Sequence, residues 1–236
     1  MVTTTGHTVK AFDDDLDELR ALISQMGGLA EAAIADAVQA LQRRDTEIAL
    51  RVVDGDRRID TLELEAERLA VRLIALRAPM ADDLREVVSA LKTAGVIERI
   101  GDYAKNIAKR VAVIADTTPI PAMSIVPEMA RVTAEMVKSA LDAFVARDAE
   151  GAARVCERDK TVDDFYNSLF RTLLTYMMEN PHHITAATHL LFIAKNLERI
   201  GDHATNVAEM VYYTATGRHM DEREKGGDAF RLPQRR

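Results

Sequence analysis

Apolar residues recur every three to four positions along almost the whole chain, which is the spacing of one buried face of an α-helix. The first apolar stripe predicts a helix over about 13–43, and it consists of Leu16, Leu19, Ile23, Met26, Ala30, Ala33, Ala37 and Leu41. Similar stripes predict five more helices, at about 46–77, 82–115, 125–147, 149–179 and 183–216. The pattern therefore predicts an all-α protein of six long helices.

Residues suited to capping or turning separate these stripes. Asp45-Thr46 and Ala78–Asp82 fall at the first two breaks, where Asp side chains (Asp82 at the second) can cap the following helix. The proline-rich stretch Thr117–Pro121 lies near the middle of the chain and predicts a linker. Gly217 predicts the end of the last helix, and the charged, aperiodic segment 218–236 predicts a mobile tail.

The chain contains an internal repeat. Residue n matches residue n+103 early in each copy, so that Arg44-Asp45 corresponds to Arg147-Asp148. Further along the offset becomes 100, and Glu98–Asp102 is identical in sequence to Glu198–Asp202. Two tandem, sequence-related three-helix bundles explain both offsets, with the first over 12–116 and the second over 124–217.

Composition narrows the functional classes. Hydrophobic residues make up 47% of the chain and aromatic residues 5%, so aliphatic side chains and methionine must fill a closely packed helical core. The net charge of -7 argues against a nucleic-acid binder. One cysteine, Cys156, excludes an intramolecular disulfide and a thiolate zinc cluster. A polar N-terminus and the lack of an apolar stretch of about 20 residues predict a cytoplasmic protein.

Acidic residues in the repeat form the candidate functional site. Carboxylates four positions apart share a helix face and repel each other, so they call for a counter-charge. A basic neighbour such as Arg99 or Arg199 is one candidate, and a bound Mg, Ca, Mn, Fe or Zn ion is another. The alternative is a solvated acidic surface. With an asparagine one turn further on, the candidate metal ligands are Asp56, Asp60, Glu98, Asp102, Asn106, Asp159, Asp163, Glu198, Asp202 and Asn206.

A glycine lies inside each acidic motif, at Gly101 and Gly201. Glycine within a helix costs roughly 1 kcal/mol relative to alanine. Its recurrence at equivalent positions predicts that another helix, or a ligand, approaches closely there.

The motif also resembles a known family. Lys92 followed by Glu98–Ala108, the second copy Glu198–Ala208 and the turn Ala78–Arg85 are similar to the signature of the PhoU family of phosphate-uptake regulators. The resemblance extends over about residues 12–216. It implies a cytoplasmic, non-enzymatic, six-helix protein that forms homodimers.

The resemblance further implies negative regulation of phosphate uptake and of the phosphate-starvation response. The implied partners are the ATPase subunit of the phosphate transporter and the membrane sensor histidine kinase. Iron or zinc clusters on the acidic faces are also implied. The second unit departs from the family pattern, because Asn180–His183 replaces Asp82-Asp83 and Arg85 has no counterpart. We therefore expect metal in the first unit before the second.

Two other classes compete with this interpretation. A ferritin-like storage protein or carboxylate metalloenzyme would use paired Glu-x-x-His motifs, and Glu179 and His182 have that spacing. However, Pro181 lies between them and should end the helix. A purely structural dimerisation module with solvated acidic faces is the third class. No nucleophile with a neighbouring base and no phosphate-binding glycine loop emerges from the sequence.

Overall fold

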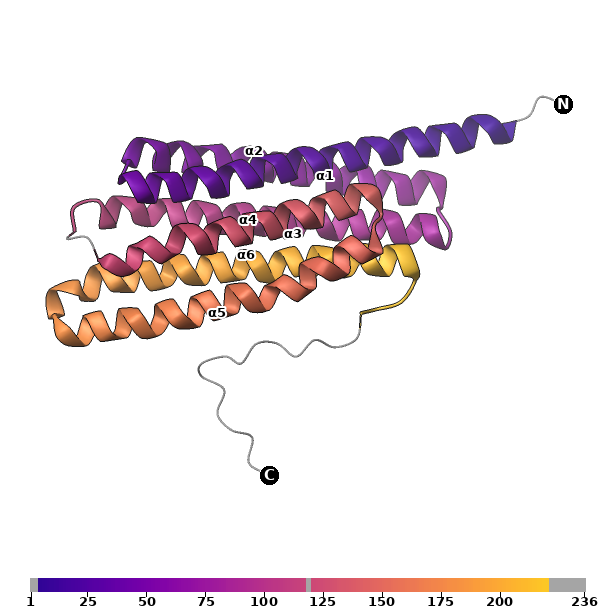
Figure 1. Ribbon diagram of the computed structural model, residues 1–236. Helices are drawn as coiled ribbons and strands as arrows, with labels where there is room; N and C mark the ends of the chain where they lie inside the picture. Colours follow the sequence, from indigo (N-terminus) through magenta and orange to yellow (C-terminus); the bar gives the residue numbers. More distant parts are fainter. Residues whose placement is uncertain (1–3, 118–119, 221–236) are drawn as a thin grey trace.

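The computed structural model describes residues 4–117 and 120–220, which form six long helices and no strand (Figure 1). The all-α prediction is confirmed. The helices are α1 (Thr4–Arg43), α2 (Thr46–Arg77), α3 (Asp82–Ile114), α4 (Val126–Ala146), α5 (Ala149–Glu179) and α6 (Ile184–Thr216), with short 3-10 helices η1 (Pro121–Ile125) and η2 (Pro181–His183). Within this part of the chain, no helix is long and apolar enough to cross a membrane.

Equivalent residues end and begin the helices in the two units. Asp45 caps α2 by accepting hydrogen bonds from two backbone amides, and Asp148 caps α5 by accepting one from Gly151. The preceding residues, Arg44 and Arg147, both adopt left-handed backbone angles with φ of 54° and 53°. The repeat detected in the sequence is thus also a repeat of backbone conformation. Gly217 ends α6 in the left-handed region, as predicted.

Some predicted boundaries were wrong. The first helix begins at Thr4 and not near Asp13, because its polar first turns carry no apolar stripe. Asp82 was predicted to cap the third helix, but it is the first residue of α3 and pairs with Arg85, while the capping position is held by Ala81. The fourth and sixth helices begin one residue late, because η1 and η2 precede them. Most of the predicted tail, from residue 221, lies outside the described residues.

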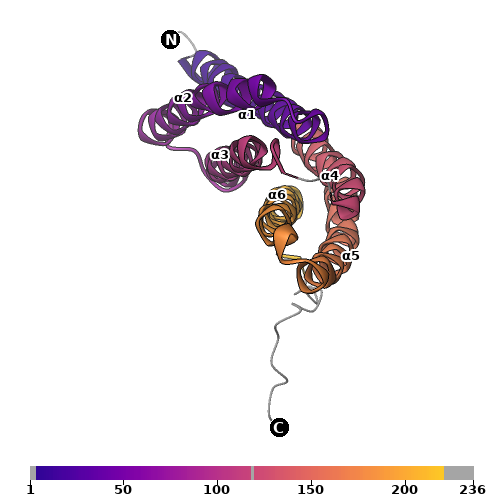
Figure 2. The same ribbon diagram turned by 90° about the vertical axis from the view of Figure 1, so that its left-hand side faces the viewer.

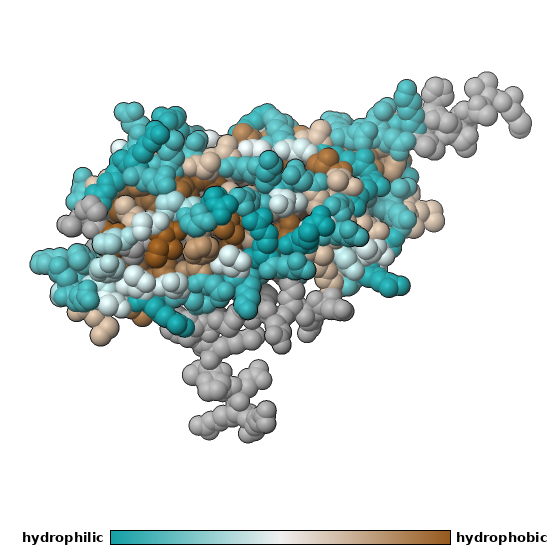
Figure 3. Space-filling view, in the orientation of Figure 1, coloured by the Kyte–Doolittle hydropathy of each residue, from teal (hydrophilic) through white to brown (hydrophobic). Residues whose placement is uncertain are grey.

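Each three-helix unit contributes one helix to a central seam. Figure 2 shows α2, α1, α4 and α5 as a curved outer layer, with α3 and α6 side by side on its inner side. The core is aliphatic, as the composition predicts, and its largest fully buried side chains include Leu19, Ile23, Met26 and Ile97. The face seen in Figure 3 is mainly hydrophilic, with separate patches of apolar residues showing between the hydrophilic ones.

Contacts across the seam relate the two units by an approximate two-fold axis. Tyr103 on α3 and His203 on α6 are equivalent positions in the repeat, and their rings meet edge to face with centroids 5.3 Å apart. Away from this point, Ser89 and Thr214 share a hydrogen bond of 2.6 Å between their hydroxyl groups. The acidic motifs that precede Tyr103 and His203 are therefore neighbours in space.

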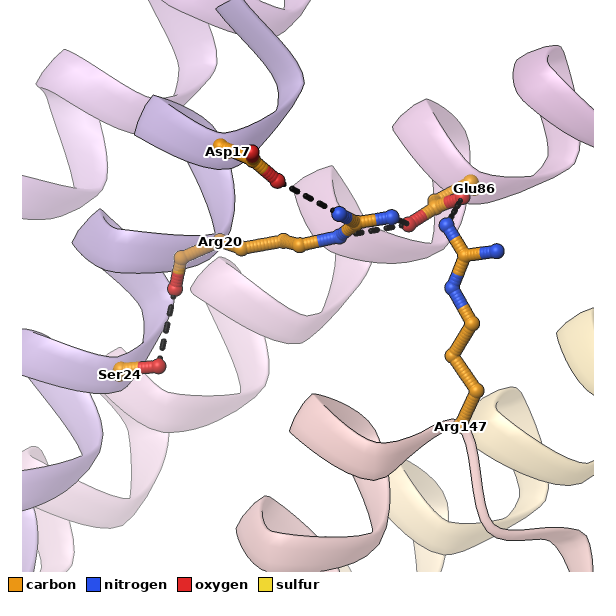
Figure 4. Close-up of polar contacts among 5 residues, drawn as sticks. All are labelled: Asp17, Arg20, Ser24, Glu86 and Arg147. Carbon is orange, nitrogen blue, oxygen red and sulfur yellow. Dashed lines mark hydrogen bonds and ion pairs between the residues drawn. The ribbon is translucent and has the colours of Figure 1, made fainter. Parts of the chain in front are cut away.

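A buried carboxylate also joins the units. Glu86 on α3 is 8% exposed and accepts hydrogen bonds from Arg20 on α1 and from Arg147 at the end of α4 (Figure 4). Asp17 pairs with the other side of the Arg20 guanidinium at 2.7 Å. Two arginines from different units thus satisfy one carboxylate that would otherwise be costly to bury.

Candidate functional site

The structure brings the predicted carboxylates together on two equivalent helix pairs. Asp56 and Asp60 on α2 face Glu98 and Asp102 on α3. In the second unit, Asp159 and Asp163 on α5 face Glu198 and Asp202 on α6. We call these two clusters the first and second acidic faces. Their members lie close enough to affect one another's ionisation, as the four-residue spacing predicts.

Burial and mutual repulsion make several of these carboxyl groups hard to ionise. On the first acidic face, burial and then the charges of Asp102 and Glu63 raise the pKa of Glu98 to about 7. On the second, burial and then Asp159, Glu198 and Asp202 raise the pKa of Asp163 to about 6. Each face therefore gains from a nearby positive charge.

The two motif glycines differ in how closely the neighbouring helix approaches: the predicted close approach is found at Gly101, whereas the contacts at Gly201 are at ordinary van der Waals distance. A Cβ on Gly101 would lie 2.8 Å from Ile59 Cδ1 and 3.5 Å from Asp56 Oδ1. A Cβ on Gly201 would lie 3.5 Å from Val162 Cγ1 and 3.8 Å from Asp159 Oδ1. Of the two positions, Gly101 is therefore the one at which an added methyl group would force a neighbouring side chain to move.

A lysine supplies the counter-charge on the first acidic face. Lys105 Nζ pairs with Asp56 on α2 and with Asp102 on α3, so one ammonium joins both helices. Burial lowers the pKa of Lys105, but the hydrogen bonds to Asp102 and Asp56 outweigh it and raise the pKa overall. Asp56 itself is only 6% exposed. Arg99, the counter-charge weighed from the sequence, lies beside Glu98 at 3.7 Å.

The second acidic face is compensated differently. Lys195 Nζ lies 2.7 Å from Glu198 Oε1, and Arg199 Nη1 lies 3.5 Å from Asp202 Oδ2, so both pairs stay within α6. Thr205 occupies the position of Lys105, and its hydroxyl donates to the backbone carbonyl of Asp202. The Oε2 atom of Glu198 is buried and has no hydrogen-bond partner.

The carboxylates of the two acidic faces are suitable ligands for a hard cation, but their present positions do not form a binding site for one. Carboxylate oxygens are the ligands that Mg, Mn, Fe and Zn accept. Oε2 of Glu198 has no hydrogen bond, but Arg199 Nε lies 4.0 Å from it and supplies a positive charge. Yet among residues 4–117 and 120–220, no three acidic, histidine or cysteine groups converge closely enough to hold a metal ion. Asn106 is half-buried and Asn206 is exposed. Binding would require the aspartate and glutamate side chains to change rotamer.

Sequence reasoning missed two residues of the first acidic face. Glu63 lies near Glu98 and is a fifth carboxylate of the first acidic face. Lys105 joins α2 to α3. Each lies three residues beyond a predicted ligand, Asp60 and Asp102, and so on the same helix face. That spacing is the signal that could have identified them.

The Glu-x-x-His spacing does not produce a metal site. Glu179 is the last residue of α5, and His182 lies in η2 beyond the helix end. Both side chains are exposed. Pro181 separates the two elements, as the sequence predicts.

Comparison with known proteins identifies the family. The model of the PhoU domain matches residues 23–111 and again 126–211, one match in each three-helix unit. This chain belongs to the PhoU family. A relative from Zymomonas mobilis, named a phosphate-specific transport system accessory protein PhoU homolog, is 56% identical over 94% of both chains. A homolog of the same name from Caulobacter vibrioides is 49% identical over 92% of this chain and 94% of its own.

Solved structures of PhoU proteins share the fold. The crystal structure of PhoU from Pseudomonas aeruginosa superposes with a TM-score of 0.85 at 38% identity, covering 88% of this chain and 100% of that one. The phosphate transport system regulatory protein PhoU from Streptococcus pneumoniae gives a TM-score of 0.83 at 28% identity, with 89% and 100% coverage. The family resemblance drawn from the acidic motif is confirmed.

Proposed function

We propose that this protein is a non-enzymatic regulator that restrains phosphate uptake when phosphate is plentiful. The observation that carries the proposal is that the PhoU domain model matches both three-helix units and that the chain aligns over 94% of a relative named a phosphate-specific transport system accessory protein PhoU homolog. The regulator works in the cytoplasm as a homodimer. It acts by protein contact, linking the transporter ATPase subunit to the sensor histidine kinase, and reaches the membrane only through these partners.

Metal ions on the acidic faces form the second part of the proposal. The candidate ligands are the eight facing carboxylates, with Asn106 and Asn206 as outer members. The raised pKa values of Glu98 and Asp163 support it, because burial and neighbouring carboxylates put each group where a positive charge would be favourable. A bound iron or zinc ion would supply that charge and stiffen the pairing of α2 with α3 or of α5 with α6. The surface offered to partners would change with it.

Deletion of the gene in its own host tests the regulatory proposal. We expect alkaline phosphatase and transporter expression to become constitutive in high phosphate, and a plasmid copy of the gene to restore repression. An unchanged phosphate response in the deletion strain would contradict the proposal. The proposed contact with the ATPase subunit is then tested by recovering the tagged protein with membranes from cells that contain or lack that subunit.

A further inference from the structure

At one end of the seam between α3 and α6, a side chain of the protein itself neutralises two arginines. Glu86 accepts hydrogen bonds there from Arg20 and Arg147 (Figure 4). A small cavity beside the carboxylate is lined by both arginines and by Ser89. We call this the Glu86 end of the seam. It shows what these positions need, which is one buried negative group between positive side chains.

The opposite end of the seam is made of the equivalent positions and lacks the carboxylate. Figure 1 shows it on the left, where α1 and α3 end and α6 begins. By the offsets of the repeat, the exchanges are Ala186 for Glu86, His189 for Ser89, Arg44 for Arg147 and Arg110 for Met210. Ala186 is buried, as Glu86 is. This end, which we call the Ala186 end, therefore keeps an arginine, has a second one and a histidine, and has lost the acidic group.

Arg110 is held in a defined position at the Ala186 end without an acidic partner. Its Cζ lies 4.2 Å from the centroid of the Phe192 ring, and its Nη1 lies 3.3 Å from His189 Nδ1. A guanidinium group can only donate, so Nδ1 accepts and the ring proton of His189 is on Nε2. Among the residues that the structure describes, no carboxylate pairs with Arg110, and burial lowers its pKa. Its Nε is buried and has no hydrogen-bond acceptor.

Arg44 leaves a second donor unsatisfied at this end. Its Nη1 donates to the carbonyl oxygens of Ala115, at 3.2 Å, and of Thr117, at 2.8 Å, while its Nη2 is buried without an acceptor. The side chain of Asp116 is exposed, and within residues 4–117 and 120–220 it forms no ion pair with Arg44. A buried donor that has lost water and gained no acceptor is unfavourable. Both arginines would therefore gain from a negative group at this end.

We propose that the Ala186 end binds inorganic phosphate, which takes the part that the Glu86 carboxylate plays at the other end. Arg110 and Arg44 donate charge-assisted hydrogen bonds to the anion, and Nε2 of His189 is a further donor. Because Arg110 Nε and Arg44 Nη2 are covered by protein atoms, binding includes a change of rotamer in both arginines. The choice of phosphate as the anion rests on the proposed function, whereas the need for an anion rests on these residues.

Calorimetric titration of the full chain with inorganic phosphate tests the proposal, with sodium chloride of equal ionic strength as the blank. We expect the native protein to bind phosphate. Arg110→Met, which copies the Glu86 end, should weaken binding at least about tenfold. Ala186→Glu should abolish it, because the new carboxylate replaces the anion. Lys109→Ala is the matched control, since it removes an exposed lysine next to Arg110, and it should bind as the native protein does.

Each result decides a different part of the proposal. Phosphate binding that persists in both Arg110→Met and Ala186→Glu would show that the anion binds elsewhere and would overturn the assignment. A native protein that binds no phosphate would overturn the inference outright. The regulatory proposal would still stand in that case, because the phosphate response of the deletion strain tests it separately.

Thermal unfolding supplies a second readout in case Ala186→Glu is poorly folded. Phosphate should raise the melting temperature of the native protein and of Lys109→Ala, and it should leave that of Arg110→Met nearly unchanged. An equal rise in all three proteins would contradict the proposed site.

Discussion

The two acidic faces share a backbone and differ in how their charge is balanced. Both have an aspartate cap before the first acidic helix, a glycine inside the motif and four facing carboxylates. In the first face a lysine joins α2 to α3, whereas in the second Lys195 and Arg199 pair with carboxylates of their own helix, α6. Duplication has thus kept the residues that shape the backbone, while the residues that bridge helices have diverged.

The same contrast is found where the units meet. Arg44 and Arg147 are equivalent and share their backbone angles, yet Arg44 donates to carbonyl oxygens at the end of α3 and Arg147 reaches Glu86 in the other unit. The position equivalent to Glu86 is Ala186. The ion-pair cluster therefore exists once and ties the two units together.

Removing Glu86 should give the largest loss of stability. Glu86→Ala leaves Arg20 and Arg147 without their shared acceptor, and we expect the free energy of unfolding to fall by about 2–3 kcal/mol. The estimate is below that for a fully buried pair because both arginines are partly exposed. Urea unfolding measures the change. Arg131→Ala, which breaks an exposed cluster with Glu128 and Glu135, is the control and should have a much smaller effect. Equal losses in the two variants would contradict the assignment of Glu86 as the joining residue.

The helix caps should behave alike in the two units. Asp45→Ala and Asp148→Ala each remove a side chain that satisfies backbone amides at a helix start, at a cost of about 1 kcal/mol. The loss at Asp45 should be the larger, because it accepts two backbone hydrogen bonds, from Glu47 and Ile48, whereas Asp148 accepts one backbone hydrogen bond, from Gly151, and a long contact of 3.5 Å from exposed Arg154. Chemical unfolding of the two variants measures this. A negligible effect at one cap alone would show that the equivalence of the backbones has no energetic counterpart.

The two motif glycines should give the smallest difference in stability when each is replaced by alanine. Gly201→Ala meets only ordinary contacts, so the gain in helix propensity should raise stability by about 0.5–1 kcal/mol. Gly101→Ala would place Cβ against Ile59 Cδ1, which must move within the core, so the gain should be cancelled. Ile59→Val copies Val162 of the second unit, and its combination with Gly101→Ala should be more stable than Ile59→Val alone. Thermal unfolding of the four variants checks this, and equal effects of the two glycine substitutions would refute it.

The sequence was sufficient for features that depend on local pattern. Helix number, the cap at Asp45 and the clustering of the acidic residues follow from periodicity, capping chemistry and repetition. It was insufficient where contacts cross between elements. Nothing local shows that Arg147 reaches Glu86, and Lys105 was passed over because a lysine on an amphipathic helix usually lies in solvent. The start of α1 was missed since its first turns are polar.

The most direct test of the account is the phosphate response of a strain that lacks the gene. With phosphate in excess, alkaline phosphatase and transporter expression should be high in the deletion strain and low again once a plasmid copy is supplied. Repression that persists in the deletion strain would contradict the claim that this PhoU protein restrains phosphate uptake.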